Sequence, residues 1–260
     1  DIICQISDMK KYRYIRLRKT VNEYFYLPEI EIISNDEKTP SKEVCKGNVI
    51  SNNYITRAGE YNWGAPGIQA YYTEETLIDG NYIYDVPYSG ICFGWGWINT
   101  PDSVTSKNTV VKNNRIENYA QRSYDAGGIY TLGQEPGSEI CGNYLKNQVN
   151  AYGAYYPDSG SAYTYVHDNV FEDIDIAFHI HSDRQYNLTV EDNYSTNGYY
   201  VDRGENCTVD APIVYVPTDI PEKAAQVVKN AGLVGQYAAL KLKAAERHTV
   251  LTFEDMYGNA

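Results

Sequence analysis

An asparagine followed two positions later by a hydrophobic residue recurs at nearly regular intervals along the middle of this chain. Successive copies lie about 24 to 33 residues apart, a period typical of solenoids and propellers rather than of a globular α/β domain. This repeat therefore constrains the fold more than any other feature. The clear copies are Asn53-Tyr54-Ile55, Asn81-Tyr82-Ile83, Asn114-Arg115-Ile116, Asn143-Tyr144-Leu145 and Asn169-Val170-Phe171, and a degenerate copy is Asn193-Tyr194-Ser195.

Each period carries the pattern of short β-strands. A pair such as Val110-Val111 precedes the asparagine triplet, and a segment that usually opens with glycine, such as Gly90-Ile91-Cys92-Phe93, follows it. Helical 3.6-residue periodicity is absent between these segments, so each period is predicted to hold two or three strands. Asparagines stacked at one turn hydrogen-bond along the stack and accept a left-handed backbone, which is their physical use in a parallel β-helix.

These patterns predict an all-β fold, a right-handed parallel β-helix of about six coils over residues 44–216. A β-propeller is the alternative, but its hairpin turns and blade motif are missing from the sequence. Residues 1–43 are expected to hold the end of an earlier coil with a β insertion or linker. Residues 217–260 are expected to form a helical cap and tail, with Asp219 as N-cap, Pro221 in the first turn and the helix over the open end of the last coil.

The composition excludes several classes of protein. The 260 residues include 22 Lys and Arg against 34 Asp and Glu, and a net charge of −12 argues against a nucleic-acid binder. No apolar run reaches the roughly 18 residues of a membrane span, so no membrane insertion is expected. Five cysteines without Cys-x-x-Cys spacing imply neither a zinc site nor a complete disulfide framework. Because no secretory leader precedes Asp1, the chain is expected to be a mature segment or a fragment.

Aligning the glycine-led strands at their glycines, with Gly153 opposite Gly128, predicts an apolar interior that includes Tyr156 and an outward column rich in aromatic side chains. Tyrosine, at 27 residues, supplies most of the aromatics, and aromatic faces suit sugar rings. An ordinary tyrosine-rich sheet surface is the alternative for the whole face, core burial is the alternative for Trp95, and a solvated turn is the alternative for Glu135. The predicted sugar-binding residues are Trp95, Tyr130, Tyr155, His179, His181, Tyr72 and Glu135.

Two acidic residues flank this column on neighbouring coils. Asp125 precedes one glycine-led strand, and Asp158 ends the next one. Coils stack about 4.8 Å apart, so side chains from adjacent coils can reach one scissile bond. Glycosidases need such a pair, in which one carboxylic acid protonates the leaving oxygen while the other attacks or activates water. Asp125 and Asp158 are therefore the predicted catalytic pair.

Three stretches carry a resemblance to a known family: Gly90 to Trp97, Asp125 to Gly133 and Tyr156 to Ser161. They resemble right-handed parallel β-helix glycoside hydrolases, the α-L-fucosidase-like and xylosidase-like subset of the pectate-lyase-like superfamily, over roughly residues 44–240. The resemblance implies secreted or periplasmic carbohydrate metabolism, with paired acids matching Asp125 and Asp158. Ser159 departs from the family, whose members often place Glu there, and several N-terminal coils are missing, so the chain resembles a C-terminal fragment.

The leading hypothesis is a glycoside hydrolase acting on an oligo- or polysaccharide of plant or host origin, without a cofactor. A polysaccharide lyase on the same fold is the second hypothesis; it would use Ca²⁺ or a basic group such as Arg184 or Arg203, but the rest of the outward column offers no Lys or Arg. A non-catalytic binding or adhesin β-helix is the third. A metal site at His179, His181 and Asp183 is a weaker hypothesis, so no metal is predicted.

Overall fold

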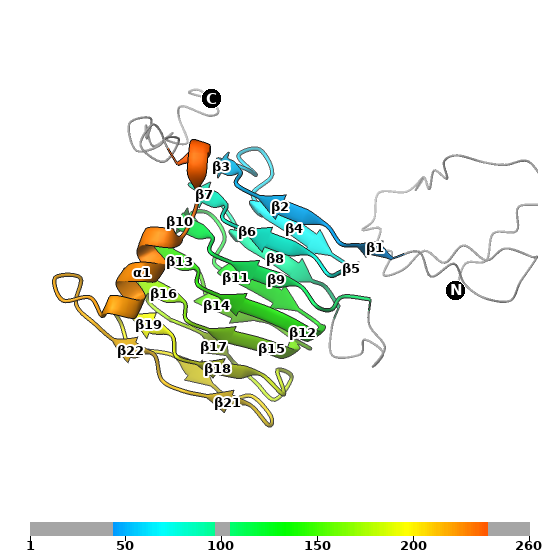
Figure 1. Ribbon diagram of the computed structural model, residues 1–260. Coiled ribbons are helices and arrows are strands. Elements are labelled where there is room, and N and C mark those ends of the chain that lie inside the picture. The colour runs from blue at the N-terminus through cyan, green and yellow to red at the C-terminus, as the bar shows by residue number, and fades with distance from the viewer. Residues whose placement is uncertain (1–43, 97–104, 239–260) are drawn as a thin grey trace, which may run out of the picture. The chain divides into compact units, whose positions relative to one another are not determined.

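The computed structural model describes residues 44–96 and 105–238. The predictions for residues 1–43 and for the tail beyond residue 238 lie outside these described residues. Within them, seven successive turns of chain stack on one another, and each full turn places one short strand in each of three parallel sheets (Figure 1). No helix of the described segments is long and apolar enough to cross a membrane.

The first and second sheets contain seven strands each, and all their strand pairings are parallel. The first sheet consists of β2 (Val49–Ser51), β6 (Leu77–Asp79), β9 (Val110–Lys112), β12 (Gln134–Cys141), β15 (Ala162–His167), β18 (Thr189–Glu191) and β21 (Thr208–Val209). The second sheet consists of β3 (Tyr54–Thr56), β7 (Tyr82–Tyr84), β10 (Arg115–Tyr119), β13 (Tyr144–Gln148), β16 (Val170–Glu172), β19 (Tyr194–Ser195) and β22 (Ile213–Val214).

The third sheet is also parallel, and two further strands continue its stack. It consists of β4 (Ile68–Tyr71), β8 (Ile91–Gly94), β11 (Gly127–Leu132) and β14 (Gly153–Pro157), continued by β17 (His179–Ile180) and β20 (Val201–Asp202). A separate pair joins β1 (Cys45–Lys46) to β5 (Thr73–Glu74). The predicted all-β parallel solenoid is confirmed, and the right-handed sense of its coils stays a prediction.

The repeated asparagines form a continuous ladder at the turn between the first and second sheets. Asn114 donates its side-chain amide to the Asn143 carbonyl oxygen at 3.0 Å, and the backbone N–H of Asn114 donates to the same oxygen at 2.9 Å. The same pair of bonds repeats at each step from Asn53 to Asn193. Left-handed backbone occurs one residue earlier than predicted, at Asn113 and its equivalents, while the ladder residues from Asn81 to Asn193 keep their side chains buried.

The interior is filled by side chains that stack in register from coil to coil. On the third sheet the inward column contains Ile68, Ile91, Ile129 and Tyr155. The prediction placed Tyr156 inside and Tyr155 outside, because it aligned Gly153 with Gly128. The structure pairs Gly153 with Gly127 instead, and a shift of one residue exchanges the two faces of a strand.

The C-terminal segment runs back along the stack as a strap. Helix α1 (Glu222–Asn230) packs Ala224 against Tyr144, Val170 and Tyr194 on the outer face of the second sheet (Figure 1). Beyond it Leu233 packs on Tyr82, and a 3₁₀ turn follows at Gly235–Tyr237.

Two details of the predicted cap are therefore wrong. The helix covers the outer face of a sheet rather than the open end of the last coil, because the apolar side chains of Tyr144, Val170 and Tyr194 lie on that face. Pro221 occupies the N-cap position in place of Asp219, and no side chain caps the helix.

Candidate active site

The outer face of the third sheet carries a dense aromatic cluster. The register aligns Cys92, Tyr130 and Tyr156 in one outward column, and His179 follows on the next coil. Tyr130 and Tyr156 stack with ring centroids 5.0 Å apart and planes 11° from parallel. This column is itself covered by a second layer of aromatic side chains, which partly shields it from water: Tyr71, Tyr88, Trp95 and Tyr152.

Asp158 follows strand β14 at the edge of this cluster. Its Oδ2 accepts a hydrogen bond of 2.7 Å from the Tyr130 hydroxyl, and its Oδ1 accepts one of 2.6 Å from the backbone N–H of Ser159. The Nε2 atom of His181 lies 3.9 Å from Oδ1. Both carboxylate oxygens are therefore held in place by donors, and the third neighbour is the imidazole ring of His181.

Asp125 precedes strand β11 and lies near enough to Asp158 for their charges to interact. Burial, and then the negative charge of Asp158, raise the pKa of Asp125 above its ordinary value. A hydrogen bond from the Tyr156 hydroxyl and the proximity of His181 act in the opposite direction without cancelling the increase. The structure thus brings the two predicted acids together, and Asp125 keeps its proton to a higher pH than an ordinary aspartic acid does.

The two stacked tyrosines hold the two acids crosswise. Tyr130 belongs to the coil of Asp125 yet binds Asp158, whereas Tyr156 belongs to the coil of Asp158 yet binds Asp125. Burial and then the charge of Asp158 raise the pKa of both tyrosines, so both hydroxyls remain protonated donors. Each acid is therefore held by a tyrosine of the neighbouring coil. Sequence reasoning missed Tyr156, because the one-residue register error had placed its side chain inside.

The two predicted histidines lie at the same end of the cluster. The rings of His179 and His181 are 5.8 and 6.0 Å from the Tyr156 ring and 5.6 Å from each other. Burial and then the proximity of His181 lower the pKa of His179. His179 is consequently neutral at neutral pH, and its ring contributes apolar surface and one hydrogen-bonding nitrogen.

Trp95 and Tyr72 lie at the opposite end, at the turn after β8 and just after β4. Trp95 stacks on Tyr71 with centroids 4.1 Å apart and meets Tyr130 edge-on at 6.2 Å. It belongs to the outer cluster and is half-buried, so core burial is excluded for it. Tyr72 is 43% exposed and adopts a left-handed backbone. Trp95 therefore extends the aromatic cluster away from Tyr130, and Tyr72 adds exposed aromatic surface just after β4.

Two predicted sugar-binding residues are wrong. Tyr155 lies in the interior, 1% exposed, with its hydroxyl 3.4 Å from the Thr131 hydroxyl. Glu135 is fully buried because β12 begins at Gln134, where a solvated turn had been expected. Its carboxyl group lies against Gly94 and, among the described residues, accepts a single long bond of 3.4 Å from Ser138; burial raises its pKa well above the ordinary value.

Among solved structures, a chain titled "Glycoside hydrolase" is similar to this protein. The two share 30% sequence identity and superpose with a TM-score of 0.52, over 77% of this chain. The matched part is 30% of the neighbour's length, so this chain spans under a third of that protein. No family model and no curated protein matches the chain. The protein is thus a parallel β solenoid similar in fold and sequence to a glycoside hydrolase.

Proposed function

We propose that this chain forms the catalytic part of a glycoside hydrolase, with Asp125 and Asp158 as its acid pair and a plant or host glycan as substrate. The observation that carries the proposal is the crossed arrangement in which Tyr130 and Tyr156 hold two interacting carboxyl groups within a partly buried aromatic cluster. The likeness to a glycoside hydrolase supports the same reaction class.

The difference between the two acids suggests their roles. Asp125, whose pKa is raised by burial and by Asp158, is suited to protonate the leaving glycosidic oxygen. Asp158, which accepts hydrogen bonds from Tyr130 and Ser159, is suited to attack the sugar carbon or to activate a water molecule. One water is added across the broken bond in either case. The product pair is therefore heavier than the substrate by one water.

The aromatic surface supplies the sugar-binding part of the proposal. A sugar ring presents an apolar C–H face that stacks on an aromatic ring while its hydroxyls stay hydrogen-bonded. The Trp95 ring, which is stacked on Tyr71, and the exposed Tyr72 are positioned for this on one side of the acids. His179 and His181 lie on the other side and are suited to bind hydroxyl groups.

Mass spectrometry of a mixed-glycan digest tests the reaction class. We expect products heavier by one water per cleavage with the natural sequence. D125N and D158N should each lower the rate of cleavage by on the order of 100-fold or more, which is the range of general acid–base catalysis. D210N, at an exposed aspartate outside the cluster, is the matched control and should retain activity. Unsaturated uronide ends would instead establish a lyase, and full activity in both variants would overturn the acid pair.

Aryl glycosides with good leaving groups separate the two roles. Such leaving groups depart without protonation, so D125N should keep much of its activity on them while losing activity on natural glycans. D158N should lose activity on both kinds of substrate, because its role does not depend on the leaving group. The opposite result would exchange the assigned roles.

A further inference from the structure

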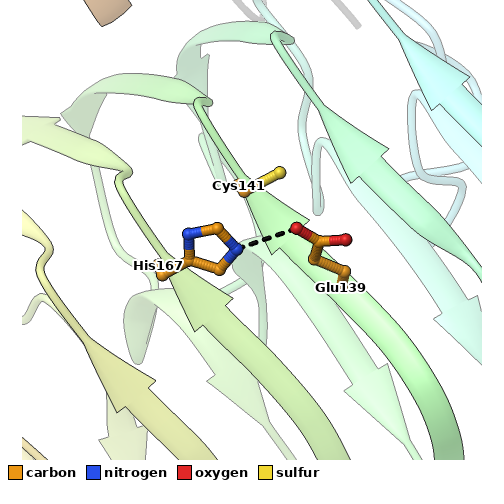
Figure 2. A group of neighbouring side chains, drawn as sticks. All are labelled: Glu139, Cys141 and His167. Carbon is orange, nitrogen blue, oxygen red and sulfur yellow. Dashed lines mark hydrogen bonds and ion pairs between the residues drawn. The ribbon is translucent and has the colours of Figure 1, made fainter.

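A second cluster of reactive side chains lies on the first sheet, outside the candidate active site. Cys141 ends β12 and pairs with His167 at the end of β15, and Glu139 lies two residues before Cys141 on the same face. Figure 2 shows the three side chains gathered on one side of these two neighbouring strands. Their ligating atoms all lie within 4.8 Å of one another, and all three residues are half-buried, so the group is accessible from solvent.

The imidazole of His167 is fixed in the way that metal sites fix their histidines. Its Nδ1 lies 2.8 Å from Asp168 Oδ2, while its Nε2 points to Glu139 Oε1 at 2.8 Å. The Tyr165 ring stacks on it with centroids 4.1 Å apart. Metal-binding histidines usually donate the second ring N–H to a carboxylate, which sets the tautomer and orients the other nitrogen. Asp168 supplies that carboxylate here.

The charges around the cluster favour a cation. Glu139 and Asp168 are acidic, and the one basic neighbour that pairs across the strands is Lys112, beside Cys141. A bound cation would take the place of the thiol proton of Cys141.

We propose that Glu139, Cys141 and His167 form a binding site for a divalent transition-metal ion of the zinc type. Sulfur, imidazole nitrogen and carboxylate oxygen are the ligands that Zn²⁺ prefers, and tetrahedral bonds of about 2.0 to 2.3 Å place ligand atoms roughly 3.3 to 3.8 Å apart. Small side-chain shifts bring the present atoms to that spacing. The thiol proton of Cys141 and any proton on His167 Nε2 leave to solvent, no electron is transferred, and the fourth position faces solvent.

Such an ion would cross-link two adjacent coils, because its ligands come from β12 and β15. It would stabilise the folded state, since the three ligands are brought together only there. This site is independent of the proposed glycosidase reaction: it lies on a different sheet, and none of its residues belongs to the aromatic cluster.

Cobalt absorption spectroscopy on the reduced full chain tests the proposal. One equivalent of Co²⁺ should produce a thiolate-to-cobalt charge-transfer band together with visible bands of tetrahedral cobalt, and Zn²⁺ should abolish both. We expect C141S to lose the charge-transfer band and D168N to bind about 10- to 100-fold more weakly. C45S, which removes an exposed cysteine elsewhere, should behave like the natural sequence.

Absence of the charge-transfer band at one equivalent, or its persistence in C141S, would overturn the site. A second measurement needs no variant: alkylation of the natural chain followed by peptide mapping. Zn²⁺ should protect Cys141 at least tenfold, while Cys45 reacts equally with and without the ion. Equal reaction of Cys141 in both conditions would contradict the proposal even if C141S failed to fold.

Discussion

At the contact between Asp125 and Tyr156, a single hydroxyl group affects the pKa of a carboxyl group. The Tyr156 hydroxyl donates to the Asp125 carboxylate and so stabilises its charged form, while burial and the Asp158 charge oppose ionisation. The resulting pKa sets the pH above which Asp125 loses the proton that the proposed reaction requires. Activity should therefore fall as pH rises through the Asp125 pKa.

The variant Y156F tests this dependence. Removing the hydroxyl removes an interaction that lowers the pKa of Asp125, so the basic limb of kcat/KM should move to higher pH. The phenyl ring preserves the stack on Tyr130. Y163F, on the first sheet, is the matched control and should leave the pH profile in place. A basic limb that stays fixed or moves to lower pH in Y156F would contradict the assignment of Asp125 as the acid.

The two acids predicted from the sequence do lie near each other, and their catalytic role stays a prediction, whereas one tyrosine was placed on the wrong face for a definite reason. The two glycines Gly127 and Gly128 offer two ways to align β11 with β14, and the sequence does not distinguish them. The structure chooses the alignment that buries Tyr155 beside Ile129. Glu135 was misplaced because Gly133 and Pro136 around it suggested a turn, whereas β12 begins at Gln134 and continues through Pro136 with a shift in register.

At the scale of elements, the asparagine ladder ties each coil to the next. Asn143 is fully buried and hydrogen-bonds to Asn114, Asn169 and the carbonyl oxygens of Val111 and Cys141. Asn53, at the first coil, is exposed and makes fewer such bonds. The ladder is also the feature that made the fold predictable, because its period is visible in the sequence and its physical role requires parallel stacking.

Replacing ladder residues should destabilise the protein according to their depth in the stack. N143A leaves several buried donors and acceptors unpaired, each worth about 1–3 kcal/mol, so we expect a loss of about 3 kcal/mol or more in unfolding free energy. N53A, at the exposed end, should cost about 1 kcal/mol or less. Urea unfolding followed by circular dichroism measures both. Equal losses at the two positions would show that the ladder bonds do not carry this stability.

At the scale of the whole molecule, the C-terminal strap joins coils that do not touch one another. Ala224 packs near the last coils, Leu233 packs on Tyr82, and the backbone N–H of Val234 donates to Asn52 Oδ1 in the first coil at 3.1 Å. Solenoids otherwise depend on contacts between neighbouring repeats alone. The strap therefore adds a long-range constraint to a stack held by local ones.

A truncated chain ending after Val216 measures what the strap contributes. We expect a lower melting temperature and earlier proteolysis of the first coils, because Leu233 no longer packs on Tyr82 and the Tyr82 ring becomes exposed. A224D should have the same effect by placing a charge against Tyr144 and Tyr194, whereas Q226D on the exposed side should not. Unchanged melting temperatures of both altered chains would show that the strap is dispensable.

The helical spacing of the sequence predicted this helix but not the surface that it covers, since apolar spacing does not reveal which surface a helix packs against.

The crossed tyrosines have a consequence for how such a protein can change through evolution. Solenoids lengthen and shorten by duplication and loss of whole coils, and most of their coils are interchangeable scaffold. The coil of Asp125 and the coil of Asp158 are not, because each carries the tyrosine that holds the other's acid. A single duplicated coil would copy half of a site, and a coil inserted between the two would separate both pairs at once. The heritable unit of the proposed acid pair is a doublet of adjacent coils.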